Sequence, residues 1–206
     1  TLYPAGAQSG TTTHVIATGA FTPWPVQVWT SDPAVKFEPD KQPGKFKVNV
    51  SPQAHPGVCW VRLHNADGAS ALRPFLIGTL KEMTEQEPND EFTPTTPLPS
   101  TTILVNGKLQ QRGDVDVFAM DLRKGQTLVA SLEANRTLKS PMDGVLQIVS
   151  AGGFVLAQPE FAIVRDGQGT GPFIVAKDSK PDELELERTV EDLDEEAARS
   201  SPVGSG

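Results

Sequence analysis

Side chains with oxygen donors gather in two short segments that are well separated along the chain. Residues 85–90 read Glu-Gln-Glu-Pro-Asn-Asp, and residues 113–116 read Gly-Asp-Val-Asp. Alternate residues of an extended chain point to the same side, so the donors within each segment can converge. Calcium prefers such donors and takes about six to eight oxygen ligands. If the two segments lie side by side they form a calcium site, for which the candidate ligands are Glu85, Glu87, Asn89, Asp90, Asp114 and Asp116.

A simpler interpretation of the same residues stays open. Acidic side chains around a Pro-Asn-Asp turn often do no more than hydrate a loop, and in an arbitrary chain this is the more frequent outcome. However, two acidic segments that are brought together disfavour each other's ionised form unless a counter-ion is present. Pro88 also favours an extended conformation at Glu87. The pairing of the two segments therefore favours a cation site over a solvated turn.

Other residues with reactive side chains do not form a recognisable catalytic pattern. The histidines His14, His55 and His64 lack the spacing of metal ligands, and the sequence around Ser70 lacks the closing glycine of a nucleophile elbow. Cys59 is the single cysteine and lies in an alternating apolar run, so we expect a buried structural thiol and not a nucleophile. We therefore predict that the protein is not an enzyme.

Composition and charge narrow the classes of protein to which the chain can belong. Of its 206 residues, 18 are glycine and 18 are proline, a turn-rich composition typical of many short strands and loops. The net charge of −8 disfavours binding to nucleic acid, which requires an excess of basic side chains. No apolar run approaches the roughly 20 residues of a membrane-spanning helix, so we predict no membrane span.

The elements expected to position the acidic residues are β-strands. Between residues 1 and 79, short segments of alternating apolar and polar residues are separated by Pro-rich or Gly-rich turns, which is typical of a β-sandwich. Residues 4–10 read Pro-Ala-Gly-Ala-Gln-Ser-Gly and resemble the opening of immunoglobulin-like modules in large exported bacterial proteins. We expect the strands of this first sandwich at residues 15–17, 26–28, 46–50, 58–64 and 75–77.

Residues 80–178 are expected to form a second β-sandwich, which makes the fold class all-β. It opens with the acidic segment and a Thr/Pro-rich stretch at residues 93–99, interpreted as a stiff linker or an edge segment. Two closing strands, at residues 161–164 and 173–176, could form a hairpin across a Gly-rich turn. The other strands are expected at residues 103–105, 117–122, 127–132, 145–149 and 154–157.

The last part of the chain, residues 179–206, differs in composition from both sandwiches. From residue 181 onward it has nine acidic and two basic side chains, so it carries most of the excess negative charge. Apolar residues recur among the acids at helical spacing, and a linker-like Ser-Pro-Val-Gly-Ser-Gly follows. We expect an acidic tail that is helical or disordered.

The two acidic segments, followed by Lys-Gly-Gln-Thr-Leu at residues 124–128, resemble the bacterial pre-peptidase C-terminal domain over about residues 80–158. The members of this family are jelly-roll sandwiches appended to secreted proteases and other exported proteins. The resemblance implies a jelly-roll-like second sandwich in which the candidate residues hold calcium. The family usually closes with a Gly-x-Tyr strand, whereas the only tyrosine here is Tyr3, so we expect the closing strands to differ.

These observations predict a non-catalytic accessory module of an exported bacterial protein that is secreted, periplasmic or displayed on the cell surface. Calcium would rigidify the joint between the two sandwiches. One alternative is an adhesion or targeting module that binds an extracellular protein or polysaccharide through Trp24, Trp29 or the basic residues of 41–47. Another is an accessory fragment of a secreted protease.

Overall fold

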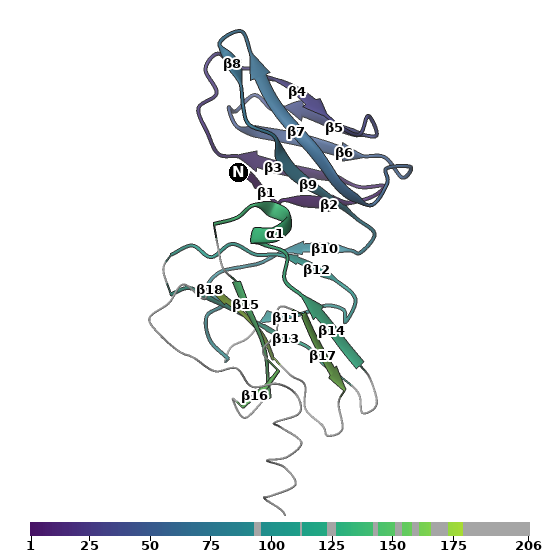
Figure 1. The fold of residues 1–206 in the computed structure, drawn as a ribbon, viewed down its shortest axis with the longest axis vertical. Coiled ribbons are helices and arrows are strands. Elements are labelled where there is room, and N and C mark those ends of the chain that lie inside the picture. The colour runs from purple at the N-terminus through teal and green to yellow at the C-terminus, as the bar shows by residue number, and fades with distance from the viewer. Residues whose placement is uncertain are drawn as a thin grey trace, which may run out of the picture.

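The computed structural model shows an almost entirely β protein, which confirms the predicted fold class (Figure 1). The predicted acidic tail, residues 179–206, lies outside the part of the chain that is described. The structure describes residues 1–92, 96–111, 113–122, 127–141, 144–150, 154–157, 161–165 and 173–178.

The first strands form two sheets that pack face to face, here called the first sandwich. One sheet has the order β1-β3-β6-β5 and is antiparallel throughout, with strands β1 (Leu2–Tyr3), β3 (Thr12–Ala17), β6 (Lys45–Val50) and β5 (Val35–Pro39). The other has the order β2-β9-β7-β4, with β8 (Gly68–Ala69) beside β7, and its strands are β2 (Gly6–Gln8), β9 (Arg73–Gly78), β7 (Gly57–Asn65) and β4 (Gln27–Thr30).

Alternation of apolar and polar residues explains why these segments are strands with one buried face. Phe46, Val48 and Val50 of β6 are buried, while Lys47 and Asn49 between them are exposed. From the opposite sheet, Cys59 and Val61 of β7 complete the core, and Cys59 is 1% exposed. The prediction that Cys59 is buried is therefore confirmed.

The strands after residue 81 pair among themselves and are here called the second β unit. Its largest sheet has five strands in the order β11-β13-β18-β15-β16, and two smaller sheets pair β10 with β12 and β14 with β17. The strands are β10 (Glu82–Thr84), β11 (Thr96–Pro97), β12 (Leu104–Asn106), β13 (Val115–Ala119), β14 (Thr127–Ser131), β15 (Gly144–Val149), β16 (Val155–Ala157), β17 (Phe161–Arg165) and β18 (Phe173–Asp178).

The two closing strands occur where the sequence predicts them, but they do not form the suggested hairpin. β17 pairs with β14, whereas β18 lies between β13 and β15 in the centre of the five-stranded sheet. Each strand therefore completes a different sheet. In this position β18 has a partner at each edge, β13 on one side and β15 on the other, so it leaves no unpaired edge.

The Thr/Pro-rich stretch at residues 93–99, interpreted as a linker or an edge segment, contributes one short strand, β11, and β10 precedes it. β10 pairs in parallel with β12, and β11 pairs in parallel with β13. One short helix, α1 (Asn135–Leu138), was not predicted from the sequence. Among the described residues, no helix is long and apolar enough to cross a membrane.

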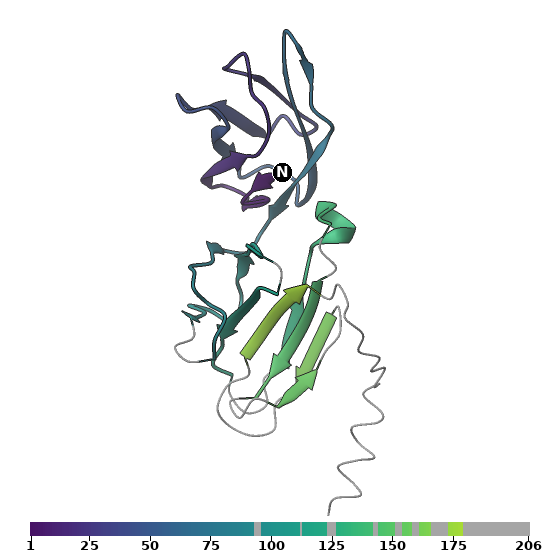
Figure 2. The same ribbon diagram turned by 90° about the vertical axis from the view of Figure 1, so that its left-hand side faces the viewer.

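The first sandwich and the second β unit meet end to end (Figures 1 and 2). The helix α1, which follows β14 in the chain, lies at the end of the first sandwich that faces the second β unit. The chain crosses directly from β9, which ends at Gly78, to β10, which begins at Glu82. α1 lies against β9, and the side-chain amide of Gln8 donates a hydrogen bond of 3.0 Å to the carbonyl of Thr79. The domain boundary at residues 79 and 80 stays a prediction, although all pairings among the described strands join partners on the same side of it.

Candidate metal centre

The acidic segment at residues 85–90 runs beside β12 and β13 and is hydrogen-bonded to both. The backbone N–H of Glu85 donates to the carbonyl of Asn106 at the end of β12, at 3.1 Å. The N–H of Val117 in β13 donates to the carbonyl of Asn89, at 2.8 Å. The predicted calcium site requires that the two acidic segments lie side by side. The hydrogen bond between Val117 and Asn89 shows that they do.

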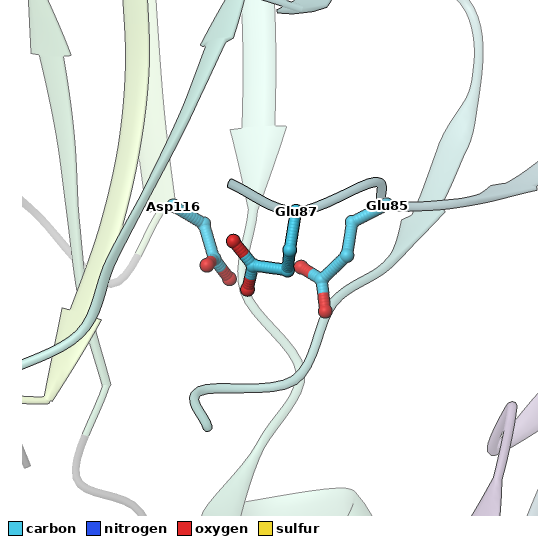
Figure 3. Close-up of side chains that lie close together, drawn as sticks. All are labelled: Glu85, Glu87 and Asp116. Carbon is cyan, nitrogen blue, oxygen red and sulfur yellow. The ribbon is translucent and has the colours of Figure 1, made fainter. Parts of the chain in front are cut away.

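Three carboxylates from these segments come together. Glu85, Glu87 and Asp116 each offer an oxygen atom, and these atoms lie within 4.8 Å of one another. Figure 3 shows the side chains of Glu85 and Glu87 descending from the same segment, with the carboxylate of Asp116 turned toward them from β13. Asp116 is 4% exposed, Glu85 is partly buried and Glu87 is exposed, so the group opens to solvent on the side of Glu87. We refer to these three residues as the carboxylate cluster.

The other candidate ligands, Asn89, Asp90 and Asp114, belong to the same two segments. Asp114 is buried, and its carboxylate accepts a hydrogen bond from the backbone N–H of Gln110. Asn89 is 2% exposed, whereas Asp90 is exposed. Among the described residues, the carboxylate cluster is the only group of three or more Asp, Glu, His or Cys side chains close enough to share one ion. Asn89, Asp90 and Asp114 are not part of it.

Several polar atoms at this site are buried without a hydrogen-bond partner. They are Oε2 of Glu85, Oδ1 of Asp116 and both terminal atoms of the Asn89 amide. A buried polar atom without a partner costs about 1–3 kcal/mol, and more when the group is charged. Either orientation of the Asn89 amide leaves an oxygen without a donor. A cation in the carboxylate cluster would satisfy the oxygen atoms of Glu85 and Asp116 at once, so these residues fit a hard metal ion.

Burial and mutual repulsion hold protons on the cluster. Burial is the main reason that the pKa of Asp116 rises to about 8, and the nearby charges of Glu85, Glu87 and Asp114 raise it further. The pKa of Glu85 is also raised, mainly by burial, although hydrogen bonding with Asp116 and the backbone of Lys108 opposes the shift. At neutral pH the ion-free cluster therefore holds a proton that a bound cation would displace.

Gly107 provides the space between two of these carboxylates, a role that the sequence did not indicate. A Cβ atom at this position would lie 2.9 Å from Oε2 of Glu85 and 3.1 Å from Oδ2 of Asp116. Asn106-Gly107 is recognisable in the sequence only as a turn. Any larger residue would push its side chain into the space that an ion needs.

Asn106 and Tyr3 complete the surroundings of the cluster and were also missed. The carbonyl of Asn106 accepts two hydrogen bonds, one from the N–H of Glu85 and one from the hydroxyl of Tyr3, each at 3.1 Å. The side-chain amide of Asn106 donates to Oε2 of Glu82 at 2.9 Å. Burial raises the pKa of Glu82, and this hydrogen bond partly offsets the shift.

Tyr3 reaches this site from the first strand of the first sandwich. Burial raises the pKa of the Tyr3 hydroxyl to about 12, and the charges of Glu85 and Asp116, hydrogen bonding with the Glu85 side chain and the charge of Glu87 add to the shift. The hydroxyl is therefore a neutral donor throughout the physiological range. No local pattern links Tyr3 to a carbonyl 103 positions away, so only the tertiary structure identifies it.

Comparison with known proteins adds little to this description. No protein-family model matches the chain, and no curated protein matches it. Among solved structures, the chain is similar to the crystal structure of Lac15 from a marine microbial metagenome, with 10% sequence identity and a TM-score of 0.23. The similarity covers 76% of this chain but only 47% of that one, and so low a TM-score supports no conclusion about fold or function. The resemblance to the pre-peptidase C-terminal domain stays a prediction.

Proposed function

We propose that this protein is a non-catalytic accessory module of an exported bacterial protein, with a structural calcium site at the carboxylate cluster. The observation that carries the proposal is the set of buried oxygen atoms without partners, on Glu85 and Asp116, at a point where three carboxylates converge. Carboxylates that only solvate a turn would point outward into water, whereas Asp116 is buried. The arrangement therefore supports a cation site over a hydrated loop.

The chemistry of the donors favours calcium over other metals. The cluster has no histidine or cysteine, which zinc and copper prefer. Magnesium demands near-ideal octahedral geometry, whereas calcium accepts the irregular arrangement that two flexible glutamates and one strand aspartate provide. Asn89 and Asp114, which are buried nearby, are our candidates for the remaining ligands, with exposed Asp90 and water on the solvent side.

An ion at the cluster would fix the segment that follows the joint onto the second β unit. Glu85 and Glu87 belong to the segment that follows β10, while Asp116 belongs to β13. A divalent ion would replace the repulsion among these groups by attraction. The segment would then be held to β13 by its side chains as well as by the backbone bond between Asn89 and Val117.

Calorimetric melting and calcium titration of the full chain test this proposal. We expect calcium to raise the melting temperature relative to chelator, because it binds the folded state, and we expect a dissociation constant of about 10⁻⁴–10⁻³ M, as in other extracellular modules. Asp116→Asn should abolish the calcium-dependent rise. Asp121→Asn, at an exposed aspartate outside the cluster, should retain it. A wild-type melting temperature that is the same in calcium and in chelator would contradict the proposal.

A second candidate function, binding of an extracellular polysaccharide, is supported by two exposed tryptophans. Trp29 is 50% exposed and Trp60 is 37% exposed, and both lie on the outer face of the sheet that contains β4 and β7. Trp29 lies opposite Arg62 in the pairing of β4 with β7, and Arg62 and Trp60 are two residues apart on β7. The side chains of Trp29 and Trp60 therefore lie on the same face of the sheet. Trp24 instead packs edge-on against Phe46, and its indole N–H donates a hydrogen bond to the carbonyl of Asp40. Its contacts therefore lie within the first sandwich.

A glycan array separates this candidate from the structural role. Flat aromatic side chains on a sheet are suited to stacking against sugar rings, and Arg62 could donate to hydroxyl groups beside them. We expect any hit to weaken at least tenfold in the double variant Trp29→Ala, Trp60→Ala, and to persist in Asp116→Asn. An array without hits, or hits that persist in the double tryptophan variant, would exclude this surface as a sugar site.

A further inference from the structure

We infer that Tyr3 is a positioning residue for the cation site, supplied by the first sandwich to a site that otherwise belongs to the second β unit. The inference deepens the proposed function and rests on it. Its basis is the Asn106 carbonyl, on which a hydroxyl from the first sandwich and the backbone N–H of Glu85 converge. Tyr3 would act on the ion through Asn106 and Glu85.

The first step of the argument is that Tyr3 is firmly attached to the first sandwich. Its strand pairs with β3, where Leu2 lies opposite Ala17 and Tyr3 opposite Ile16. Leu2 is buried in the core of the sandwich. Adjacent side chains of a strand point to opposite faces, so the anchoring of Leu2 directs Tyr3 outward. Figure 1 shows β1 at the end of the sandwich that faces the second β unit.

The second step is that the residue accepting this bond is tied directly to the site. Asn106 lies opposite Thr84 in the pairing of β12 with β10, and its side-chain amide holds Glu82. Gly107, the next residue, lies between the side-chain oxygens of Glu85 and Asp116. A shift of Asn106 therefore moves both the backbone anchor of Glu85 and the wall of the space between the carboxylates.

The third step is thermodynamic. If an ion holds Glu85 in place, the carbonyl of Asn106 is held as well, and the hydroxyl of Tyr3 finds a fixed acceptor. By linkage, whatever the Tyr3 hydroxyl contributes to calcium binding, calcium contributes equally to the contact between the first sandwich and Asn106. Another contact between the two parts, α1 against β9, does not involve the three residues of the carboxylate cluster. The bond of Tyr3 is therefore a connection through which the ion would restrain the first sandwich.

Calcium titration of the full-length Tyr3→Phe variant tests the inference. The substitution keeps the ring and removes only the hydroxyl, and the loss of one hydrogen bond predicts calcium binding about threefold to tenfold weaker than in the wild type. Trp29→Phe, a conservative change of an exposed aromatic residue in the same sandwich, should leave the affinity unchanged. Wild-type affinity in the Tyr3→Phe variant, with the wild type binding calcium, would overturn the inference and leave the proposed function intact.

A spectroscopic measurement on the unmodified protein provides an independent check. Tyr3 is the only tyrosine, so tyrosine labelled with ¹³C in the ring gives NMR signals from this residue alone. We expect these signals to move during a calcium titration, with a midpoint equal to the calorimetric dissociation constant. Signals that stay still while calcium binds would overturn the inference. Absence of any calcium binding by the wild type would instead overturn the proposed function itself, and this inference with it.

Discussion

At the scale of single residues, the central feature is a carboxylate that is buried without the partners it needs. Asp116 alternates with Val115 and Val117 along β13, and Val117 is buried in a small apolar cluster. An aspartate at such a position is costly, because burial disfavours its charged form. The cost is reasonable only if the ionised side chain gains a strong partner, and a bound cation is the partner that suits the neighbouring Glu85 and Glu87.

The raised pKa of Asp116 predicts how stability depends on pH in calcium-free buffer. Its pKa is about 8 in the folded protein, above its ordinary value of 3.8, so the folded state binds the proton more tightly than the unfolded state. Stability should therefore fall as pH rises from about 4 to about 8. Melting experiments across this range should show the decline in the wild type and a smaller decline in Asp116→Asn.

Saturating calcium should reduce the same decline, because an ion favours the ionised carboxylate. Binding below pH 8 should also release protons, which calorimetry in buffers of different ionisation enthalpy detects. A melting temperature that rises steadily from pH 4 to 8 in calcium-free buffer would contradict the assignment of a raised pKa to Asp116. A decline of equal size in Asp116→Asn would show that another group is responsible.

At the scale of secondary-structure elements, the site depends on a close approach of three backbone segments. The acidic segment pairs with β12 through Glu85 and with β13 through Asn89. The end of β12 must then pass close to side chains from both neighbours, and glycine at position 107 makes this approach possible. Asn106 reinforces it, because its backbone and side chain both hold the β10 region.

The substitution Gly107→Ala should separate calcium binding from folding. The added methyl group would come within 2.9 Å of Glu85 and 3.1 Å of Asp116, and the flexible end of Glu85 can move away at little cost. We expect calcium affinity to fall at least tenfold, while stability in chelator changes by about 1 kcal/mol or less. Titration calorimetry and denaturant unfolding measure the two quantities.

Gly78→Ala is the matched control for this substitution. A Cβ atom at Gly78 would meet only ordinary contacts, with Oε1 of Glu82 at 3.6 Å, and calcium affinity should be unchanged. Equal losses of affinity in the two variants would mean that the joint, and not the space between the carboxylates, controls binding. Unchanged affinity in Gly107→Ala would place the ion elsewhere.

At the scale of the whole molecule, three features of the described residues link the first sandwich and the second β unit. The connection from β9 to β10 is short, α1 lies against β9, and Tyr3 reaches Asn106 across the joint. The negative charge of the cluster is concentrated at this joint. An ion there would change the restraint on the joint more than it would change either core, which is the behaviour expected of a structural metal in a modular protein.

Some features followed from the sequence alone because they depend on local patterns. The alternation in β6 and β7 predicts strands with one buried face, and the same alternation predicts the burial of Cys59. The acidic spacing indicates a wider set of six candidate ligands, to which Glu85, Glu87 and Asp116 belong. These inferences need only the two-residue period of a strand and the chemistry of oxygen donors.

Only the tertiary structure decided which of these residues meet and what surrounds them. The positions of Asn106, Gly107 and Tyr3 depend on the parallel pairing of β10 with β12 and on the way the first sandwich meets the second β unit. The closing strands likewise separate into different sheets, and β18 has a partner at each edge, β13 and β15. Such contacts join residues far apart in the chain, and no local spacing encodes them. The sequence therefore determined the donors, and the long-range strand pairing determined the site.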